Sequence, residues 1–332
     1  MTLVTGAGGM VGSHMVELFY AAGKDVVGLY YNPTVDMWEI NSEIRMIECD
    51  VRCSQSVQQI VAENMPDRIY HLAAQSYPTV SWERPYETMD ININGTIAVF
   101  EAIKKIREVH SAYDPVVVVA CSSAEYGAAF EKLNEPKIKE TAELLPLHPY
   151  GVSKVAQDLL AYQYFVNDSI RTIRARIFNT TGTRKINDVV SDFTRRAVEQ
   201  EKAKVSILRV GNVETHRAIM DVRDLVSALE LLAENGEYGE AYNISASSTI
   251  QVKQIISIIE KVIGKAFDVS VDDKLLRSSD EKVIIGNTEK LVKDTGWRQT
   301  ITFEETVAEM INYWRQKCNI SDFTEDSTLS FI

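Results

Sequence analysis

Three residues of this sequence have the types and the spacing to form an acid catalyst. Tyr150 and Lys154 are four positions apart, and Ser122 precedes them. Residues four apart on a helix project from one face, so the Lys154 ammonium can lie beside the Tyr150 phenol. A positive charge there lowers the pKa of a phenol from about 10 toward neutral pH, where it can exchange a proton with a sugar hydroxyl or ketone. By itself, a Tyr-x-x-x-Lys spacing is more often part of an ordinary surface helix.

A glycine-rich loop lies near the start of the chain. Gly6, Gly9 and Gly12 are spaced three apart, between an apolar strand predicted at residues 2–4 and an apolar-periodic helix that reaches residue 22. In this context a helix N-terminus can hold a pyrophosphate. A tight strand-to-helix turn that binds no ligand is the alternative.

Strands and helices alternate along the rest of the first half. This order predicts an α/β fold with a Rossmann-like doubly wound parallel sheet, whose catalytic residues lie at the carboxyl ends of the strands. We expect a loop over residues 77–86 and a helix that opens at Asn92. The predicted strands are residues 25–31, 44–49, 68–72, 116–120 and 170–178.

The second half predicts a smaller α/β substrate domain that is interleaved with the first. Its predicted helices are residues 189–202, 221–235, 251–263 and 301–316, and its strands are residues 205–210 and 241–245. The strand at 241–245 is expected to return to the main sheet. The predicted domains are therefore 1–178 for the dinucleotide and 179–318 mainly for the substrate, followed by a tail at 319–332.

The end of the second strand is where such folds choose between cofactors. An acidic residue there binds the ribose of NAD, whereas an arginine accommodates the phosphate of NADP. This chain has Tyr30, Tyr31 and Asn32 at that point. The lack of a carboxylate slightly favours NADP, and NAD stays open. Asp50, after the third strand, either accepts from the adenine amino group or is a solvated loop acid.

Composition excludes several classes of protein. The 332 residues carry a net charge of −12, which argues against a nucleic-acid or anionic-membrane partner. The four cysteines lack metal-ligand spacing and the five histidines are scattered, so no metal site is expected. No stretch resembles a signal peptide or a membrane span, and we expect a cytoplasmic protein with reduced thiols.

Together these motifs resemble the extended short-chain dehydrogenase/reductases, which modify nucleotide sugars. The resemblance covers nearly the whole chain and rests on the glycine loop, Asp50-Val51, residues 71–74, Asn92-x-x-Gly95-Thr96, Ser122-Ser123 and Tyr150-x-x-x-Lys154. It implies a catalytic trio of Ser122, Tyr150 and Lys154. The cofactor-binding residues that it implies are Gly6, Gly9, Met10, Val11, Tyr31, Asp50, Val51, Leu72, Ala73, Ala74, Tyr150 and Lys154.

Within that group, residues 73–76, 210–217 with 221–224, and 276–280 resemble the branch that uses GDP-linked 6-deoxyhexoses. Arg217 and Arg277 are the predicted ligands of the sugar diphosphate, and the alternative for each is a surface ion pair. The substrate-binding residues that the resemblance implies are Ser76, Ser123, Ala124, Glu125, Asn179, Arg217 and Arg277.

The choice of reaction depends on the turn after the fifth strand. The glutamate that dehydratases of this branch use falls on Ala124 here, while Glu125 is one position later and, on an extended segment, points to the opposite face. The sequence therefore favours a reductase of the C4 ketone of a GDP-4-keto-6-deoxyhexose, giving a GDP-rhamnose-type product with Tyr150 as the acid. A GDP-mannose 4,6-dehydratase or a nucleotide-sugar C4-epimerase with the same trio is the alternative.

Relatives of this kind pair through a four-helix interface. Phe100, Leu159, Leu160, Tyr162 and Phe165 are extra apolar residues on the two helices concerned, so a homodimer or a dimer of dimers is expected. A monomer that buries these residues in its own core is the competing interpretation.

Overall fold

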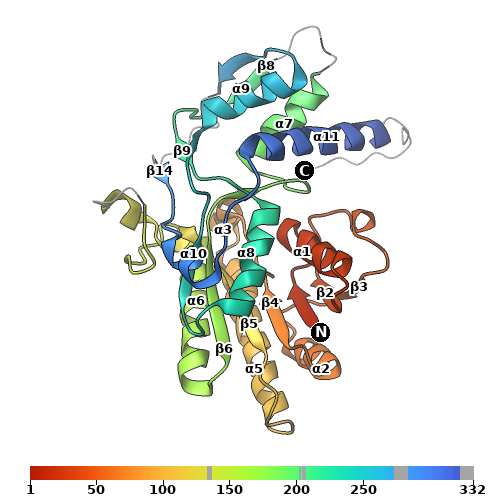
Figure 1. The fold of residues 1–332 in the computed structure, drawn as a ribbon, viewed down its shortest axis with the longest axis vertical. Helices are drawn as coiled ribbons and strands as arrows, with labels where there is room; N and C mark the ends of the chain where they lie inside the picture. Colours follow the sequence, from red (N-terminus) through yellow and green to blue (C-terminus); the bar gives the residue numbers. More distant parts are fainter. Residues whose placement is uncertain (133–136, 202, 204–206, 273–282, 322–332) are drawn as a thin grey trace.

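A seven-stranded parallel sheet forms the centre of the computed structural model (Figure 1). The structure describes residues 1–132, 137–201, 203, 207–272 and 283–321. The strand order is β11-β6-β5-β4-β1-β2-β3, which confirms the predicted Rossmann-like fold. The strands are β1 (Thr2–Thr5), β2 (Val26–Tyr30), β3 (Arg45–Glu48), β4 (Arg68–His71), β5 (Val116–Ser122), β6 (Arg171–Ile177) and β11 (Ala241–Ile244).

Helices cover both faces of this sheet. Val116 and Val118 of β5 belong to one buried cluster, which includes residues of α1 and α8, whereas Val117 and Val119 belong to a second cluster with residues of α2, α5 and α6. Successive side chains of a strand point to opposite faces, so a strand buried on both faces is apolar throughout. The helices are α1 (Met10–Ala21), α2 (Ser54–Asn64), α5 (Gly95–Arg107), α6 (Pro149–Asp168), α8 (Val222–Asn235) and α10 (Glu289–Thr295).

A second lobe lies at one end of the molecule, where α7, α9 and α11 gather (Figure 1). These helices enclose their own apolar cluster, to which Phe193, Ile255 and Trp314 contribute. The later strand β11 nevertheless pairs with β6 in the main sheet. The remaining elements of this half are α7 (Val189–Glu199), α9 (Val252–Ile263), α11 (Phe303–Ser321), β7 (Thr180–Thr181), β8 (Ile207–Val210), β9 (His216–Arg217), β10 (Met220–Asp221), β12 (Ile250–Gln251), β13 (Asp268–Val271) and β14 (Val283–Ile284).

Three local predictions are wrong. The segment expected as a loop contains α3 (Pro78–Glu83) and α4 (Pro85–Met89), each of which begins with a proline whose fixed φ suits a first helical turn. Asn92 does not open a helix, because it lies inside a π-helix, Asp90–Asn94, that joins α4 to α5. The turn after β5 is a 3₁₀-helix, η3 (Ser123–Glu125), instead of an extended segment.

No helix in the described ranges is both long enough and apolar enough to cross a bilayer. The predicted domain limits at residues 178 and 318 stay predictions.

Candidate active site

The fold brings the predicted trio together at the carboxyl end of β5. Ser122 is the last residue of β5, and Tyr150 lies in the first turn of α6. The Ser122 side chain interacts with the Tyr150 phenol. Lys154, one turn further along α6, donates from Nζ to the Ala120 carbonyl at 2.8 Å and lies 5.7 Å from the centroid of the Tyr150 ring. The three side chains predicted as a catalytic trio therefore lie close together at this end of the sheet.

The start of α6 is fixed by a residue that the sequence analysis did not single out. His148 is its N-cap, and its Nδ1 accepts from the Gly151 N–H at 3.0 Å. The His148 ring also stacks on the Tyr150 ring, with centroids 5.8 Å apart. Pro149 follows at the first helical position, where its missing N–H costs nothing. His148 therefore both begins the helix and restrains the phenol.

Burial, more than charge, sets the proton affinities in the trio. Burial raises the pKa of Tyr150 to about 12, and the hydrogen bond from Ser122 only partly opposes this change. Burial lowers the pKa of Lys154 to about 8. The expectation that Lys154 moves the pKa of Tyr150 toward neutral pH is therefore not met in this structure, since Lys154 is itself desolvated. At neutral pH, Tyr150 carries a proton that it can donate.

The glycine loop has the shape that an anion site needs. Gly6 has a φ of +71°, and a Cβ there would lie 2.7 Å from the Ala73 nitrogen. A Cβ at Gly12 would lie 2.3 Å from the Gly6 oxygen. Gly9 is the N-cap of α1, and the first turn has neither a capping side chain nor an acidic residue. The N–H groups of this turn are thus available to a pyrophosphate, so the loop fits a dinucleotide.

An arginine that the sequence analysis missed lies beside Asp50 and Tyr31, two of the predicted cofactor-binding residues. Arg52 donates from Nε and Nη2 to the Asp50 carboxylate, with Nη2 to Oδ2 at 2.6 Å, and interacts with the half-exposed Tyr31. Its Nη1 lies 3.7 Å from Asp90. The Asp-x-Arg spacing was the available signal. Asp50 is thus engaged by Arg52, and its predicted contact with an adenine stays a prediction, as does that of the buried Val51.

The predicted substrate residues come from several segments of the chain. Ser76 is exposed after β4, and Ser123 is half-buried in η3. Asn179 follows β6, and its Nδ2 is buried without a hydrogen-bond partner among the described residues. Arg217 lies in β9 and donates to the His216 carbonyl at 3.0 Å. Arg277 lies outside the described residues, and all these roles stay predictions.

Glu125 does not face the substrate side of its turn. Its side chain is fully buried, and Oε1 accepts from the Ser122 N–H at 2.7 Å. The Ser122 hydroxyl in turn accepts from the Ala124 N–H at 3.2 Å, which completes a capping box. The predicted contact between Glu125 and substrate is therefore wrong, because the 3₁₀ turn directs this side chain into the protein. Ala124 is the half-buried residue at the turn.

Comparison with known proteins identifies the family. The chain matches the family model of GDP-mannose 4,6 dehydratase over residues 3–310. The chain belongs to the GDP-mannose 4,6-dehydratase family. This match confirms the resemblance on which the enzyme class and the catalytic trio were predicted.

Members and neighbours of the GDP-mannose 4,6-dehydratase family carry out several reactions. GDP-6-deoxy-D-mannose reductase from Pseudomonas aeruginosa is 25% identical over 318 residues, covering 95% of this chain and 97% of that one. Human GDP-mannose 4,6 dehydratase is 25% identical over 351 residues, covering 94% and 90%. Among solved structures, RMD from P. aeruginosa complexed with NADPH has a TM-score of 0.82 at 24% identity, covering 95% and 99%. UDP-glucose 4-epimerase with UDP-glucose from Thermotoga maritima has a TM-score of 0.85 at 22% identity, covering 96% and 99%.

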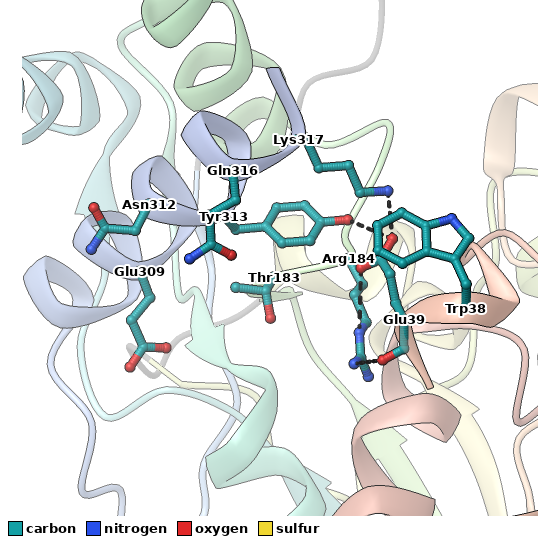
Figure 2. Close-up of a pocket in the computed structure, with 9 residues that line it drawn as sticks. All are labelled: Trp38, Glu39, Thr183, Arg184, Glu309, Asn312, Tyr313, Gln316 and Lys317. Atoms are coloured by element: carbon teal, nitrogen blue, oxygen red, sulfur yellow. Dashed lines mark hydrogen bonds and ion pairs between the residues drawn. The ribbon is translucent and has the colours of Figure 1, made fainter. Parts of the chain in front are cut away.

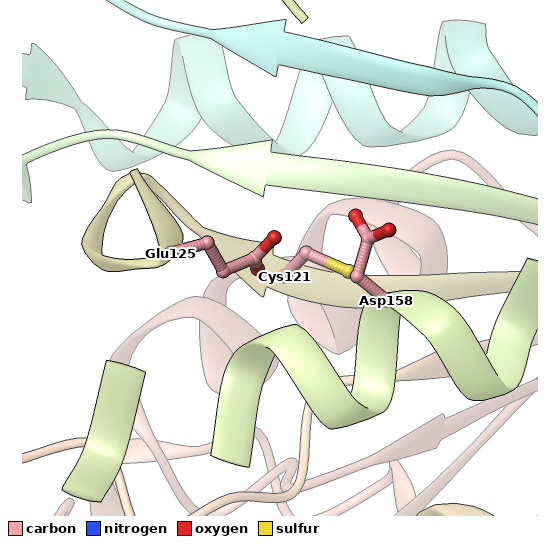
Figure 3. A group of neighbouring side chains, drawn as sticks. All are labelled: Cys121, Glu125 and Asp158. Atoms are coloured by element: carbon pink, nitrogen blue, oxygen red, sulfur yellow. The ribbon is translucent and has the colours of Figure 1, made fainter. Parts of the chain in front are cut away.

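In this member of the dehydratase family, three potential metal ligands lie together (Figure 3). The ligand atoms of Cys121, Glu125 and Asp158 are all within 4.8 Å of one another and are buried. Asp158 is already paired with Arg174 at 2.6 Å and with Arg176 at 2.9 Å. Although burial opposes it, these guanidinium groups lower the pKa of Asp158. Because Arg174 and Arg176 already neutralise Asp158, this cluster does not fit a metal ion.

A buried polar network joins the glycine loop to the catalytic helix. His71 bonds Thr5 at 2.9 Å through Nδ1 and Thr96 at 3.0 Å through Nε2, and Gln157 of α6 donates to Thr96 at 2.7 Å. Burial lowers the pKa of His71 to about 3, so the ring is neutral. Asn92 extends the network by donating to Ser153 at 2.8 Å. These residues position the cofactor loop and the trio relative to one another.

Figure 2 shows a pocket of about 520 Å³ that none of the trio lines. It lies between η1 (Met37–Glu39) and α11, with the exposed Trp38 on one side. Glu39 pairs with Lys317 and lies 3.7 Å from Arg184. Arg184 also bonds both oxygens of Glu17, at 2.8 and 3.1 Å. This pocket is therefore where the last helix is tied to the sheet domain.

Proposed function

We propose that this protein reduces the C4 ketone of a GDP-4-keto-6-deoxyhexose with NAD(P)H. The observation that carries the proposal is the turn after β5. It presents Ala124 where a dehydratase of this branch places its glutamate, and the adjacent Glu125 is buried. Removal of water from a sugar needs a base and an acid beside the trio, whereas reduction of a ketone needs only one proton donor.

Tyr150 is the proposed acid. Its raised pKa, about 12, means that the phenol is protonated at neutral pH and can pass its proton to the ketone oxygen. Ser122, which interacts with the same phenol, holds that oxygen and stabilises its developing charge. When bound, NAD(P)H supplies a hydride to the carbon of that ketone. Lys154 is assigned to the ribose of the cofactor and to the charge balance of the phenol.

The substrate is proposed to lie over Ser123, Ala124 and Asn179. The unpartnered Nδ2 of Asn179 supports this placement, because a buried amide without a partner is costly unless a ligand satisfies it. Arg217 and Arg277 remain the proposed cations for the diphosphate. A GDP-linked sugar is favoured by the GDP-6-deoxy-D-mannose reductase and GDP-mannose dehydratase relatives, and a UDP-linked sugar by the epimerases.

NADP is the favoured cofactor. The RMD structure was solved with NADPH, and Arg52 of this chain lies beside Tyr31, where a 2′-phosphate would meet the protein. A homodimer is proposed because α6 exposes an apolar stripe that includes Leu159 and Tyr162, which are 53% and 48% exposed.

Dehydration or epimerisation is the second candidate. The matching family model is that of the dehydratases, and UDP-glucose 4-epimerase from Lacticaseibacillus casei is 26% identical over 338 residues. Both reactions use a Ser-Tyr-Lys trio and regenerate their cofactor in each cycle, so they consume none.

The deciding experiment follows the absorbance of reduced cofactor, with NADPH and NADH in parallel, on GDP-4-keto-6-deoxymannose. Consumption of one cofactor for each ketone reduced is the expected result. In a separate reaction, GDP-mannose is incubated without added cofactor and the products are analysed. A 4-keto product from GDP-mannose without net cofactor consumption would instead establish a dehydratase, and a stereoisomer of the supplied sugar an epimerase.

A further inference from the structure

Glu125 is a buried carboxyl that the proposed reaction does not use. Oε1 accepts from the Ser122 N–H, so one end of the carboxyl fixes the main chain of a catalytic residue. Oε2 is buried without a hydrogen-bond partner and lies 3.4 Å from the Arg176 Nε. Burying a carboxyl oxygen without a hydrogen-bond partner costs free energy, so the presence of Glu125 at this position indicates a role for it.

Ionisable groups face Glu125 from each of the elements packed around it. Cys121 comes from β5, Arg176 comes from β6, and Tyr150, Lys154 and Asp158 come from α6. Figure 3 shows Glu125 extending toward Cys121 and Asp158. The charge of Asp158 disfavours a second negative charge, and Arg176 is shared between the two carboxyls.

We infer that Glu125 is a positioning residue, which holds the Ser122 main chain in place through its buried Oε1 and acts on the neighbouring Tyr150 and Lys154 through its charge. This inference rests on the proposed role of the trio. Burial, with the charge of Asp158 adding to it, raises the pKa of Glu125 to about 8, so its charge changes near the working pH.

The direction of the effect follows from the charges. A negative charge on Glu125 disfavours the phenolate of Tyr150 and favours the ammonium of Lys154, so it raises the pKa of both groups. Removing that charge must lower both pKa values. The pH–activity profile has one titration step for Tyr150 and one for Lys154. Both steps must then move toward lower pH.

Glu125→Gln tests this inference because the amide can still accept from the Ser122 N–H but cannot ionise. We expect the pH profile of kcat to move about one pH unit lower, as a single neighbouring charge would produce. The KM for the nucleotide sugar should stay within about twofold, since Glu125 does not face it. Glu125→Ala should also lower kcat at every pH, because the main chain of Ser122 loses its acceptor.

Glu140→Gln is the matched control, because Glu140 holds a different main-chain group, the Asn243 N–H, at 2.9 Å. Its pH profile should coincide with that of the wild type. A profile of Glu125→Gln that also coincides with the wild type would overturn the inference. So would an unchanged kcat with a KM raised about tenfold, which would make Glu125 a substrate contact after all.

A readout without substrate separates this inference from the proposed reaction. Lysine side chains labelled with ¹³C are titrated by NMR, and Lys154→Met assigns the relevant signal. In the wild type this signal should titrate near 8, the pKa of Lys154, and Glu125→Gln should move the midpoint lower. An unmoved midpoint contradicts the inference whatever the substrate is. A moved midpoint in an enzyme that does not reduce the keto sugar would leave the inference standing and reject the reaction.

Discussion

The Tyr150 hydroxyl is desolvated, and this raises its pKa. The sequence places the tyrosine and the lysine on one helical face, and the structure agrees, but their burial depends on β5 and β6, which lie elsewhere in the chain. Spacing could therefore predict the partners of Tyr150 but not its pKa. The same limit applies to Glu125, since a one-residue difference in the turn decides whether its carboxylate faces the substrate or the interior.

Tyr150→Phe removes the proton that the proposed reaction transfers. We expect kcat to fall by about 10²–10⁴-fold, the usual contribution of a general acid, while affinity for the reduced cofactor is kept. Steady-state kinetics and cofactor fluorescence titration measure the two quantities. Tyr162→Phe, on an exposed part of the same helix, is the control and should retain full activity. Unchanged turnover of Tyr150→Phe would reject the acid role.

Arg52 tests the preference for NADP. Its Nη1 is 3.7 Å from Asp90, too far for a hydrogen bond, so this donor is not committed to that carboxylate. We expect Arg52→Gln to raise the KM for NADPH about tenfold, the value of one charge-assisted hydrogen bond, and to leave the KM for NADH nearly unchanged. Initial rates with the two cofactors measure this ratio. An equal effect on both cofactors would assign Arg52 a purely structural role with Asp50.

At the scale of helices and strands, the apolar runs were the reliable signal. The run before Ser122 is buried on both faces, and its strand lies where the sequence placed it. The segment over residues 77–86 was less predictable, because α3 and α4 are too short to show a helical period and are positioned by their packing on α6. The π-helix at Asp90–Asn94 has no sequence signal of its own, since it depends on the helices that it joins.

Glu39 links an element of the sheet domain to the last helix. The Glu39 side chain is only 8% exposed and pairs with Lys317 and Arg184. Glu39→Gln would remove one carboxylate from Lys317 and from Arg184, which keep Asp36 and Glu17, and we expect it to lower the free energy of unfolding by about 1–3 kcal/mol. Denaturant titration measures the loss. Glu108→Gln, which breaks an exposed pair with Lys105, should cost less than about 1 kcal/mol. Equal losses would show that the Glu39 contacts add nothing.

For the whole molecule, the predicted interface residues divide into two groups. Phe100 is fully buried and stacks on Tyr164, so it belongs to the core of one subunit. Leu159 and Tyr162 are about half exposed on α6, and so is Val166, which was not among the predicted residues. Helical periodicity alone could not separate the two groups, because both lie on apolar faces.

The exposed group predicts a homodimer, since apolar side chains gathered on one helix face mark an interaction surface. A Leu159→Glu, Val166→Glu double variant should sediment as a monomer of 37.3 kDa in analytical ultracentrifugation, whereas we expect the wild type to sediment as a dimer. Val109→Glu, at an exposed site on another part of the surface, should leave the dimer intact. A wild type that is monomeric at micromolar concentration would reject the interface.

The two faces of α6 have different roles. One face holds Tyr150 and Lys154 against β5 and β6, and the other presents the stripe around Leu159. A second subunit packed on that stripe would stabilise the helix that carries Tyr150. The activity per subunit would then depend on the fraction of the protein that is dimeric, and so on its concentration. Specific activity would then decline on dilution below the dissociation constant of the dimer, and a standard assay with nanomolar enzyme would understate the rate at which this protein works at cellular abundance.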